Sequence, residues 1–265
     1  IRDIGVTGVQ TCALPISDTS ATDSFSAVTG ILTTSDRDDA GSFVYSISQT
    51  GATVDSGAYV VSAANYDRRI VSTLGTLYLD SASGAYRFAA DAAAVNARSS
   101  NTTSSFTLTV SDGATTDSRT LSISIIGVND APVLASVASI NLTDTSADDT
   151  FTNVTGTLAG SDVDTGAALA YAIVGGASPV APSTSFTVGA DSFDLRRTGA
   201  YGTLYLASAS GAYAFVPDDA AIEGLRTNDS ESFTFQVSDG TASALQTLTV
   251  NITAVNDSTV LRSEE

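Results

Sequence analysis

The sequence has no histidine, lysine, tryptophan or methionine. Without histidine the chain cannot form a Ser-His-Asp triad and lacks the commonest general base, and without lysine it cannot form a Schiff base with a carbonyl substrate. Two carboxylates could still act as a glycosidase pair, but the acidic residues fall on predicted turns and linkers with no evident aromatic cleft. We therefore do not expect an enzyme.

Cysteine is also nearly absent, since Cys12 is the only one. An internal disulfide is impossible, so stability has to come from core packing or from bound metal. No apolar run is long enough to span a bilayer, and the first residues lack the charged-then-apolar pattern of a signal peptide.

Basic residues are few: 29 acidic residues stand against 11 basic ones, all arginine, and the net charge is -18. This balance disfavours nucleic acid or an anionic membrane as partner and favours cations. A second interpretation is that the acidic surface only keeps an extended protein soluble.

The two ends of the chain differ from the rest. Residues 1–16 and 262–265 resemble the translation of a sequencing adapter, and the single cysteine lies in the first of these segments. We expect both segments to be artefacts that pack poorly and take no part in the native fold.

The remaining sequence repeats itself once. The segment that starts at Asp18 aligns with the one that starts at Asp144, a shift of 126 residues, and GTLYLDSASGAYRF aligns with GTLYLASASGAYAF further on. So long a period indicates whole domains in tandem rather than a solenoid of small units. We predict one repeat at 17–130 and a second at 131–261.

Each repeat shows the pattern of a β-sandwich. Apolar and polar residues alternate at 104–110, 121–125, 232–238 and 247–252, which indicates strands with one buried face. Ser83-Gly84 and Ser210-Gly211 predict hairpin turns, and only 91–97 and 217–225 suggest helix, of one or two turns each. A strand at 133–142 has no native counterpart in the first repeat, which therefore looks truncated. The expected fold is all-β, with two tandem immunoglobulin-like sandwiches.

Acidic residues recur at fixed places in these repeats. Calcium takes six to eight oxygen ligands, and clustered carboxylates repel one another unless a cation lies between them. Asp and Asn are also common in turns without any metal, but their recurrence in both halves favours calcium. The candidates are the Asp-x-Asp pairs Asp36, Asp38 and Asp162, Asp164; the Ser-Asp-Gly turns Asp112 and Asp239; the linker pairs Asn129, Asp130 and Asn256, Asp257; and Asp229 with Glu231.

Taken together, the motifs resemble the VCBS repeats of large bacterial secreted adhesins of the RTX type, which are cadherin-like domains. Both repeats carry Val-Thr-Gly followed by Ser-Asp-x-Asp, then Gly-Thr-Leu-Tyr-Leu, Ser-Gly-Ala-Tyr, Val-Ser-Asp-Gly and Val-Asn-Asp. The resemblance covers nearly all of residues 17–261. It implies calcium at the junctions between successive domains and an extracellular or cell-surface location, reached by type I secretion.

The resemblance also implies which residues share each junction. An inter-repeat site would take Asn129, Asp130, Asp162, Asp164 and Asp239. Asp36, Asp38 and Asp112 would serve a junction to a preceding repeat, and Asp229, Glu231, Asn256 and Asp257 one to a following repeat. Residues 101–105, where the cadherin pattern has acids, contain no carboxylate, and Gly127 replaces a leading Asp in the linker. Both departures bear on the number and affinity of the ions.

The function that this implies is a calcium-stiffened spacer in cell adhesion or biofilm formation, with neighbouring repeats of the same chain as partners. Two alternatives stay open. One is a carbohydrate- or receptor-binding module, which would need an exposed aromatic platform from Tyr66, Tyr86, Tyr201 and Tyr213, although hairpin tyrosines more often pack in the core. The other is an accessory domain of an extracellular hydrolase.

Overall fold

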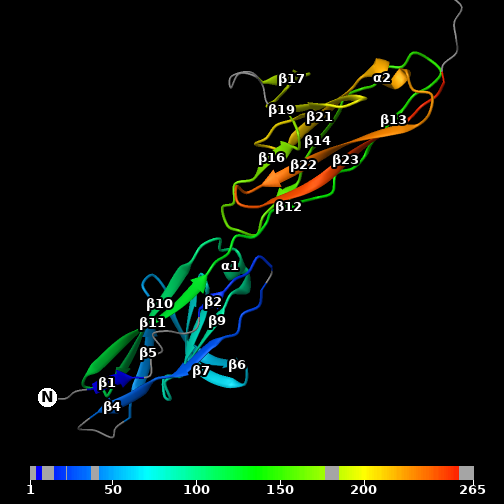
Figure 1. Cartoon of the computed structure of the whole chain (residues 1–265). Helices are drawn as coiled ribbons and strands as arrows, with labels where there is room; N and C mark the ends of the chain where they lie inside the picture. The colour runs from blue at the N-terminus through cyan, green and yellow to red at the C-terminus, as the bar shows by residue number, and fades with distance from the viewer. Residues whose placement is uncertain (1–3, 8–14, 22, 37–41, 177–184, 257–265) are drawn as a thin grey trace, which may run out of the picture. The chain divides into compact units, whose positions relative to one another are not determined.

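The computed structural model describes residues 4–7, 15–21, 23–36, 42–176 and 185–256 (Figure 1). The chain divides into two compact units, Ile1–Asp130 (unit 1) and Ala131–Glu265 (unit 2). In each unit the described residues form strands and one short helix. In the part of the chain that the structure describes, no helix is both long enough and apolar enough to cross a membrane.

Unit 2 contains two four-stranded sheets. The first has the order β13-β23-β22-β16, and its strands are Ile140–Thr143, Ser243–Thr253, Asp229–Ser238 and Ala170–Ile173. The second has the order β14-β21-β20-β19, with strands Val154–Thr157, Ala212–Pro217, Gly202–Leu206 and Leu195–Thr198. The smaller elements are β12 (Val133–Leu134), β15 (Gly160–Ser161), β17 (Phe186–Val188), β18 (Asp191–Phe193) and α2 (Asp219–Glu223).

The opening strand predicted at 133–142 is divided in the structure. Its start, β12, pairs with β15, and the later strand β13 runs parallel to β23 in the first sheet. The chain thus passes from the small β12–β15 sheet to the four-stranded sheet that contains β13.

Unit 1 repeats this arrangement. One sheet has the order β2-β11-β10-β5, with strands Ile16–Ser17, Thr116–Ile126, Thr102–Ser111 and Val44–Ser48. The other has the order β3-β9-β8-β7-β6, with strands Val28–Ile31, Ala85–Ala90, Gly75–Leu79, Ala64–Ser72 and Val54–Val61. The remaining elements are β1 (Ile4–Thr7), β4 (Thr33–Asp36) and α1 (Ala92–Asn96).

Alternation along the long strands builds both cores. On β22, Phe233, Phe235 and Val237 are at most 2% exposed, while the residues between them face outward. Phe106 and Leu108 on β10 are buried in the same way. Removing such a phenylalanine side chain typically costs about 3–5 kcal/mol, so these rows account for much of each unit's stability. The prediction of an all-β tandem sandwich is confirmed.

The predicted hairpin turns and helices are also present. Gly84 and Gly211 have φ of +74° and +73°, a left-handed conformation in which side chains are strained. Each helix is one turn long and begins at an aspartate cap: Asp91 Oδ1 accepts the N–H of Ala94, and Asp218 Oδ1 accepts that of Ala221, both at 3.1 Å.

The prediction that residues 1–16 stay outside the fold differs from the structure in two places. The backbone of β1 pairs antiparallel with β4, and Ile16, which is 6% exposed, joins the core while β2 pairs in parallel with β11. In unit 2 the same positions are held by β12 and β13. An open sheet edge offers unpaired N–H and C=O groups to any extended segment, which explains why these residues complete the strand order of unit 1.

Candidate metal centre

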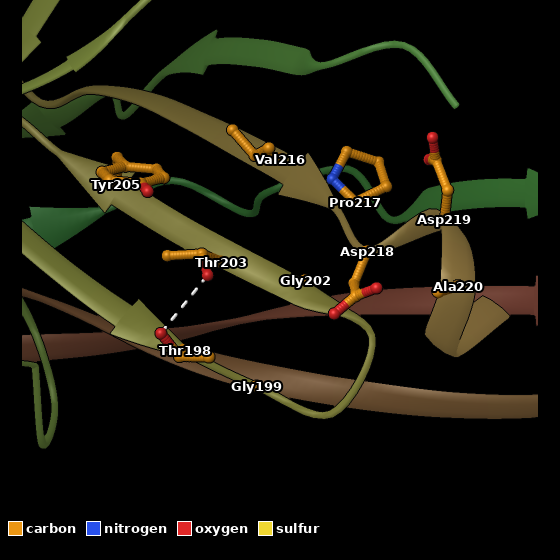
Figure 2. Close-up of a pocket in the computed structure, with 10 residues that line it drawn as sticks. All are labelled: Thr198, Gly199, Gly202, Thr203, Tyr205, Val216, Pro217, Asp218, Asp219 and Ala220. Carbon is orange, nitrogen blue, oxygen red and sulfur yellow. Dashed lines mark hydrogen bonds between the residues drawn. The ribbon is translucent and has the colours of Figure 1, made fainter. Parts of the chain in front are cut away.

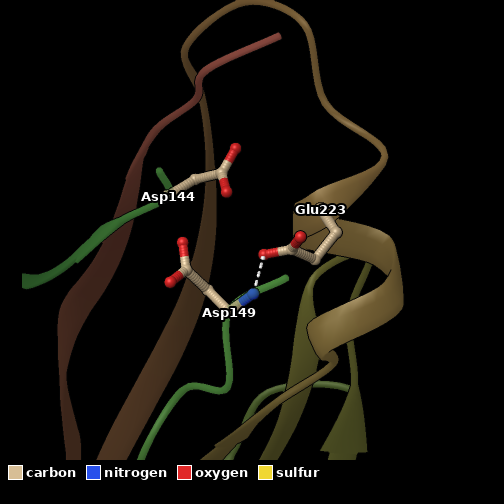
Figure 3. Close-up of side chains that lie close together, drawn as sticks. All are labelled: Asp144, Asp149 and Glu223. Atoms are coloured by element: carbon tan, nitrogen blue, oxygen red, sulfur yellow. Dashed lines mark hydrogen bonds between the residues drawn. The ribbon is translucent and has the colours of Figure 1, made fainter. Parts of the chain in front are cut away.

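Three acidic side chains meet at one end of unit 2. Asp144 follows β13, Asp149 lies in the loop that leads to β14, and Glu223 is the last residue of α2. One carboxylate oxygen from each lies within 4.8 Å of the other two. Figure 3 shows the three carboxylates turned toward a common space. It is the one group of at least three His, Cys, Asp or Glu residues so placed among the described residues.

The pairing of β13 with β23 places Asp144. Its N–H donates to the carbonyl of Thr253 at 2.9 Å, and its Oδ2 accepts the N–H of Val255 at 3.0 Å. The residue is 1% exposed, so its carboxylate is held inside the end of the sandwich, beside the end of β23.

Backbone hydrogen bonds orient the other two carboxylates. Asp149 Oδ2 accepts the N–H of Thr145 at 2.6 Å, which closes the loop between them. Glu223 Oε1 accepts the N–H of Asp149 at 3.1 Å, the bond drawn in Figure 3. Helix α2 is itself anchored by Ile222, which is fully buried in the core. Backbone hydrogen bonds therefore hold the cluster together, and two of them join segments that are far apart in the sequence.

The electrostatics of the cluster favour a bound cation. Asp144 Oδ1 is buried and has no hydrogen-bond partner within the described residues. Leaving a buried charged oxygen unsatisfied is costly, and two carboxylates beside it add repulsion. Calcium binds oxygen at 2.3–2.6 Å, so two ligands on opposite sides of the ion lie about 5 Å apart. The spacing of the three carboxylates fits such an ion.

Three residues that the sequence predicts as calcium ligands, Asp162, Asp164 and Asp239, lie at the opposite end of unit 2. Asp162 and Asp164 follow β15, where the N–H of Gly160 donates to the hydroxyl of Tyr171, the residue that pairs with Val237 near the end of β22. Strand β22 runs from one end of unit 2 to the other. Its first residue, Asp229, pairs with Ile252 at the end that contains Asp144, whereas Asp239 follows its last residue at the other end. A strand of ten residues spans about 33 Å.

At that end, the N–H of Asp164 donates to Asp162 Oδ1 at 2.8 Å, and Asp162 Oδ2 is buried without a hydrogen-bond partner. Asp239 Oδ1 accepts the N–H groups of Thr241 and Ala242 and so closes the β22–β23 turn. One oxygen of Asp162 and one of Asp239 thus hold neighbouring backbone N–H groups, and whether these aspartates also bind calcium stays a prediction.

The linker residues are described with unit 1. The side-chain amide of Asn129 donates to the carbonyl of Asp130 at 2.6 Å, and Asp130 is 6% exposed. That Asn129 and Asp130 share an ion with Asp162, Asp164 and Asp239 stays a prediction.

Of the residues assigned to a preceding junction, Asp36 ends β4, and Asp38 lies outside the described residues. Asp112 corresponds to Asp239. Its Oδ1 accepts the N–H groups of Ala114 and Thr115, and these bonds, that of Thr115 most, hold the pKa of Asp112 below its ordinary value.

Two of the residues assigned to a following junction, Asp229 and Glu231, accept hydrogen bonds from the turn that contains Ala200 and Tyr201. The carboxylate of Asp229 accepts the hydroxyl of Tyr201, and this bond lowers the pKa of the aspartate. Glu231 accepts the N–H groups of Ala200 and Tyr201, but burial outweighs these bonds and raises its pKa. Asn256 is exposed, and Asp257 lies outside the described residues.

The four tyrosines considered for a carbohydrate platform are buried or half-buried in the structure. Tyr66 and Tyr86 are buried, at 7% and 1% exposed, and Tyr201 and Tyr213 are half-buried. The ring of Tyr213 packs on Phe235 with centroids 5.3 Å apart. These four tyrosines thus serve the packing of the sandwiches.

A hollow of about 390 Å³ lies where the β19–β20 turn meets the start of α2 (Figure 2). Its two carboxylates, Asp218 and Asp219, both have structural tasks: Asp218 caps α2, and Asp219 Oδ1 accepts the N–H of Phe151 at 3.1 Å. The lining contains Thr198 and Thr203, whose hydroxyls bond to each other. This hollow shows no nucleophile paired with a base.

Sequence reasoning missed Asp144, Asp149 and Glu223. A signal existed for two of them, because Asp144 and Asp149 recur in the first repeat as Asp18 and Asp23. Glu223 gave no such signal, since its counterpart is Asn96. Its approach to the aspartates follows from the placement of α2, which pattern alone does not specify.

No family model and no curated protein matches the chain. Solved structures that resemble it include the protocadherin GammaB4 extracellular domain, at 16% identity over 95% of this chain and 33% of that one, with a TM-score of 0.36. Drosophila N-cadherin EC1-4 is 14% identical over 95% of this chain and 51% of that one, with a TM-score of 0.30. The chain spans about a third of the first. At these scores the similarity carries no functional argument.

Proposed function

We propose that this chain is a calcium-binding structural repeat, and that the Asp144, Asp149 and Glu223 cluster of unit 2 holds one of its ions. Two observations carry the proposal: among the described residues the buried Oδ1 of Asp144 has no hydrogen-bond partner, and one oxygen of the Asp144 carboxylate lies within 4.8 Å of oxygens of Asp149 and Glu223. A cation would satisfy this oxygen and remove the repulsion at once.

The donor set selects the kind of metal. Only carboxylate oxygens converge, and the sequence has no histidine and a single cysteine. Zinc, copper and iron prefer nitrogen or sulfur ligands, whereas calcium accepts carboxylates with backbone oxygens and water. The net charge of -18 also raises the concentration of cations near the surface.

Calcium at the ends of the sandwiches would make the tandem units a stiff spacer. Its ligands here come from the first strand, the following loop and the last helix, so one ion would fix three segments together. We further propose that the parent is a secreted or cell-surface adhesin of the VCBS type, in which such repeats hold a binding domain away from the cell. In this proposal the chain itself performs no catalysis.

Hydrogen exchange of the full chain tests the calcium site. Calcium should slow exchange in peptides that contain Thr145, Asp149 and Val255, because their N–H groups donate to the ligating carboxylates. Asp144→Ala should abolish this protection. Asp148→Ala is the matched control, since Asp148 is exposed in the same loop and outside the cluster. Calcium-dependent protection that survives in Asp144→Ala would disprove the site.

A further inference from the structure

Unit 1 contains a counterpart of the acidic cluster, built on the same backbone. Asp18 is 3% exposed, its N–H donates to the carbonyl of Ile126, and its Oδ2 accepts the N–H of Val128, as Asp144 does with Thr253 and Val255. Asp23 Oδ2 accepts the N–H of Thr19 at 2.7 Å, as Asp149 does with Thr145. The two ends thus share the same pattern of hydrogen bonds, although the bond from Val128 to Asp18 is longer, at 3.5 Å against 3.0 Å for Val255 to Asp144.

The third position differs in chemistry. Asn96 ends α1 as Glu223 ends α2, and its Oδ1 accepts the N–H of Asp23 at 3.0 Å, the counterpart of the bond from Asp149 to Glu223. The other terminal atom of Asn96 is a nitrogen, which donates to the carbonyl of Asp23 at 3.2 Å. An amide N–H cannot ligate a cation, and it occupies a carbonyl oxygen that could otherwise face one.

One charge therefore separates the two clusters. Asp144, Asp149 and Glu223 carry three carboxylates, whereas Asp18, Asp23 and Asn96 carry two carboxylates and an amide. Among sites of similar geometry, the number of charged ligands is a main determinant of calcium affinity. Asn96 is also 3% exposed and hydrogen-bonded on both terminal atoms, so it is held in place and does not turn aside for another ligand.

We infer that the two units bind calcium with different affinities, and that the last residue of the short helix in each unit determines the difference. Glu223 makes the cluster of unit 2 the site with the higher calcium affinity. Asn96 makes the affinity of the unit 1 cluster at least about tenfold lower, because that cluster has one charged ligand fewer. Calcium then fills the end of unit 2 first. The end of unit 1, beside the segment at Val128 that leads to unit 2, responds only at higher calcium.

This inference rests on the proposed calcium site, and one titration distinguishes the two. Hydrogen exchange of the full chain is measured across a calcium series, with peptides around Thr19 and Val128 reporting unit 1 and those around Thr145 and Val255 reporting unit 2. The expected result is a midpoint for unit 1 at least tenfold above that of unit 2. Absence of protection in both units would overturn the calcium site itself, whereas equal midpoints would overturn only the difference in affinity.

Two substitutions at the helix ends test the role of these residues directly. Glu223→Gln keeps an oxygen that accepts the N–H of Asp149 and removes the charge, so it should raise the midpoint of unit 2 toward that of unit 1 and leave unit 1 unchanged. Asn96→Glu should lower the midpoint of unit 1 at least tenfold. If the buried glutamate of Asn96→Glu prevents unit 1 from folding, the Glu223→Gln result decides whether the helix-end residue determines the affinity. That variant should fold, because Glu223 is only half-buried. An unchanged midpoint for unit 2 in Glu223→Gln would refute the assignment.

Discussion

Replacing Asp144 by asparagine should change the stability of unit 2 in opposite directions with and without calcium. The substitution keeps the shape of the side chain and an oxygen that can accept the N–H of Val255. It removes one of three charges whose oxygens lie within 4.8 Å of one another. In chelator the variant should therefore be more stable than the wild type.

The magnitude follows from Coulomb's law. At 4.8 Å each pair of charges repels by about 0.9 kcal/mol in water and about 3.5 kcal/mol at an effective dielectric constant of 20. Asp144 takes part in two such pairs. Because Asp149 and Glu223 are only half-buried, the lower value applies better, and we expect a gain of about 2 kcal/mol, or roughly 6–10 °C in Tm.

Calcium should reverse this order. At 1,000 times its dissociation constant, a ligand adds about 4.1 kcal/mol to the wild type. Asp144 is the buried ligand of the cluster, so we expect its substitution to weaken binding about 1,000-fold or more, well beyond the factor inferred for the half-buried Glu223. The variant then gains almost nothing from calcium and is about 2 kcal/mol less stable than the wild type. Urea titration followed by hydrogen exchange of β22 and β23 peptides measures unit 2 within the full chain. Equal destabilisation by Asp144→Asn in chelator and in calcium would refute the repulsion on which the site rests.

Three further predictions concern packing, protonation and the predicted junction. Gly202→Ala should destabilise unit 2 by about 1–3 kcal/mol in urea unfolding, because a Cβ there would lie 2.6 Å from the carbonyl oxygen of Val216, whereas Gly224→Ala should be tolerated. Burial acts to raise the pKa of Asp194, but hydrogen bonds from the hydroxyl and N–H of Ser208 outweigh burial and lower the pKa. This carboxylate therefore contributes to the stability of unit 2 above pH 3.8, and the contribution is lost as the pH falls through the pKa of the folded state. Asp194→Asn should then be less stable than the wild type at pH 7 and equal to it once the carboxyl is protonated, and a gap that does not change with pH would contradict this. Finally, calcium should narrow the distribution of distances between the units in small-angle scattering at low salt, and Asp162→Ala with Asp164→Ala should abolish the narrowing; scattering curves that superimpose in calcium and chelator would refute a stiffened spacer.

Alternation and turn residues were sufficient to predict the sandwiches. Phe233, Phe235 and Val237 alternate with polar residues, and such a strand can bury only one face, so the core followed from the pattern. Gly84 and Gly211 marked turns because positive φ strains other residues. The division of the strand at 133–142 was not predicted, since both halves are apolar and pairing partners far along the chain decide which sheet each half joins.

The three residues of the candidate site were not among those predicted from the sequence. Recurrent aspartates drew attention to the ends of the domains, yet turns such as the one closed by Asp239 use aspartate to bind their own backbone. The buried cluster depends on α2, whose last residue meets the end of the first strand only after folding. Local sequence carries no information about that meeting, because Asp144 and Glu223 are 79 residues apart.

The parallel pairing of β13 with β23 has a mechanical consequence. In such a pair the free end of the first strand and the free end of the last point in opposite directions, so tension applied along the chain loads their hydrogen bonds in shear. The rungs from Ile140–Val250 to Thr143–Thr253 must then yield together instead of opening one after another. The hydrogen bond from Val255 to Asp144 lies beside the Thr143–Thr253 pair, at the end of β23 where tension would be applied. An ion held by Asp144 would therefore strengthen the pairing that is loaded first. If the proposed ion is bound, the force needed to unfold the repeat should therefore rise as calcium occupies the cluster.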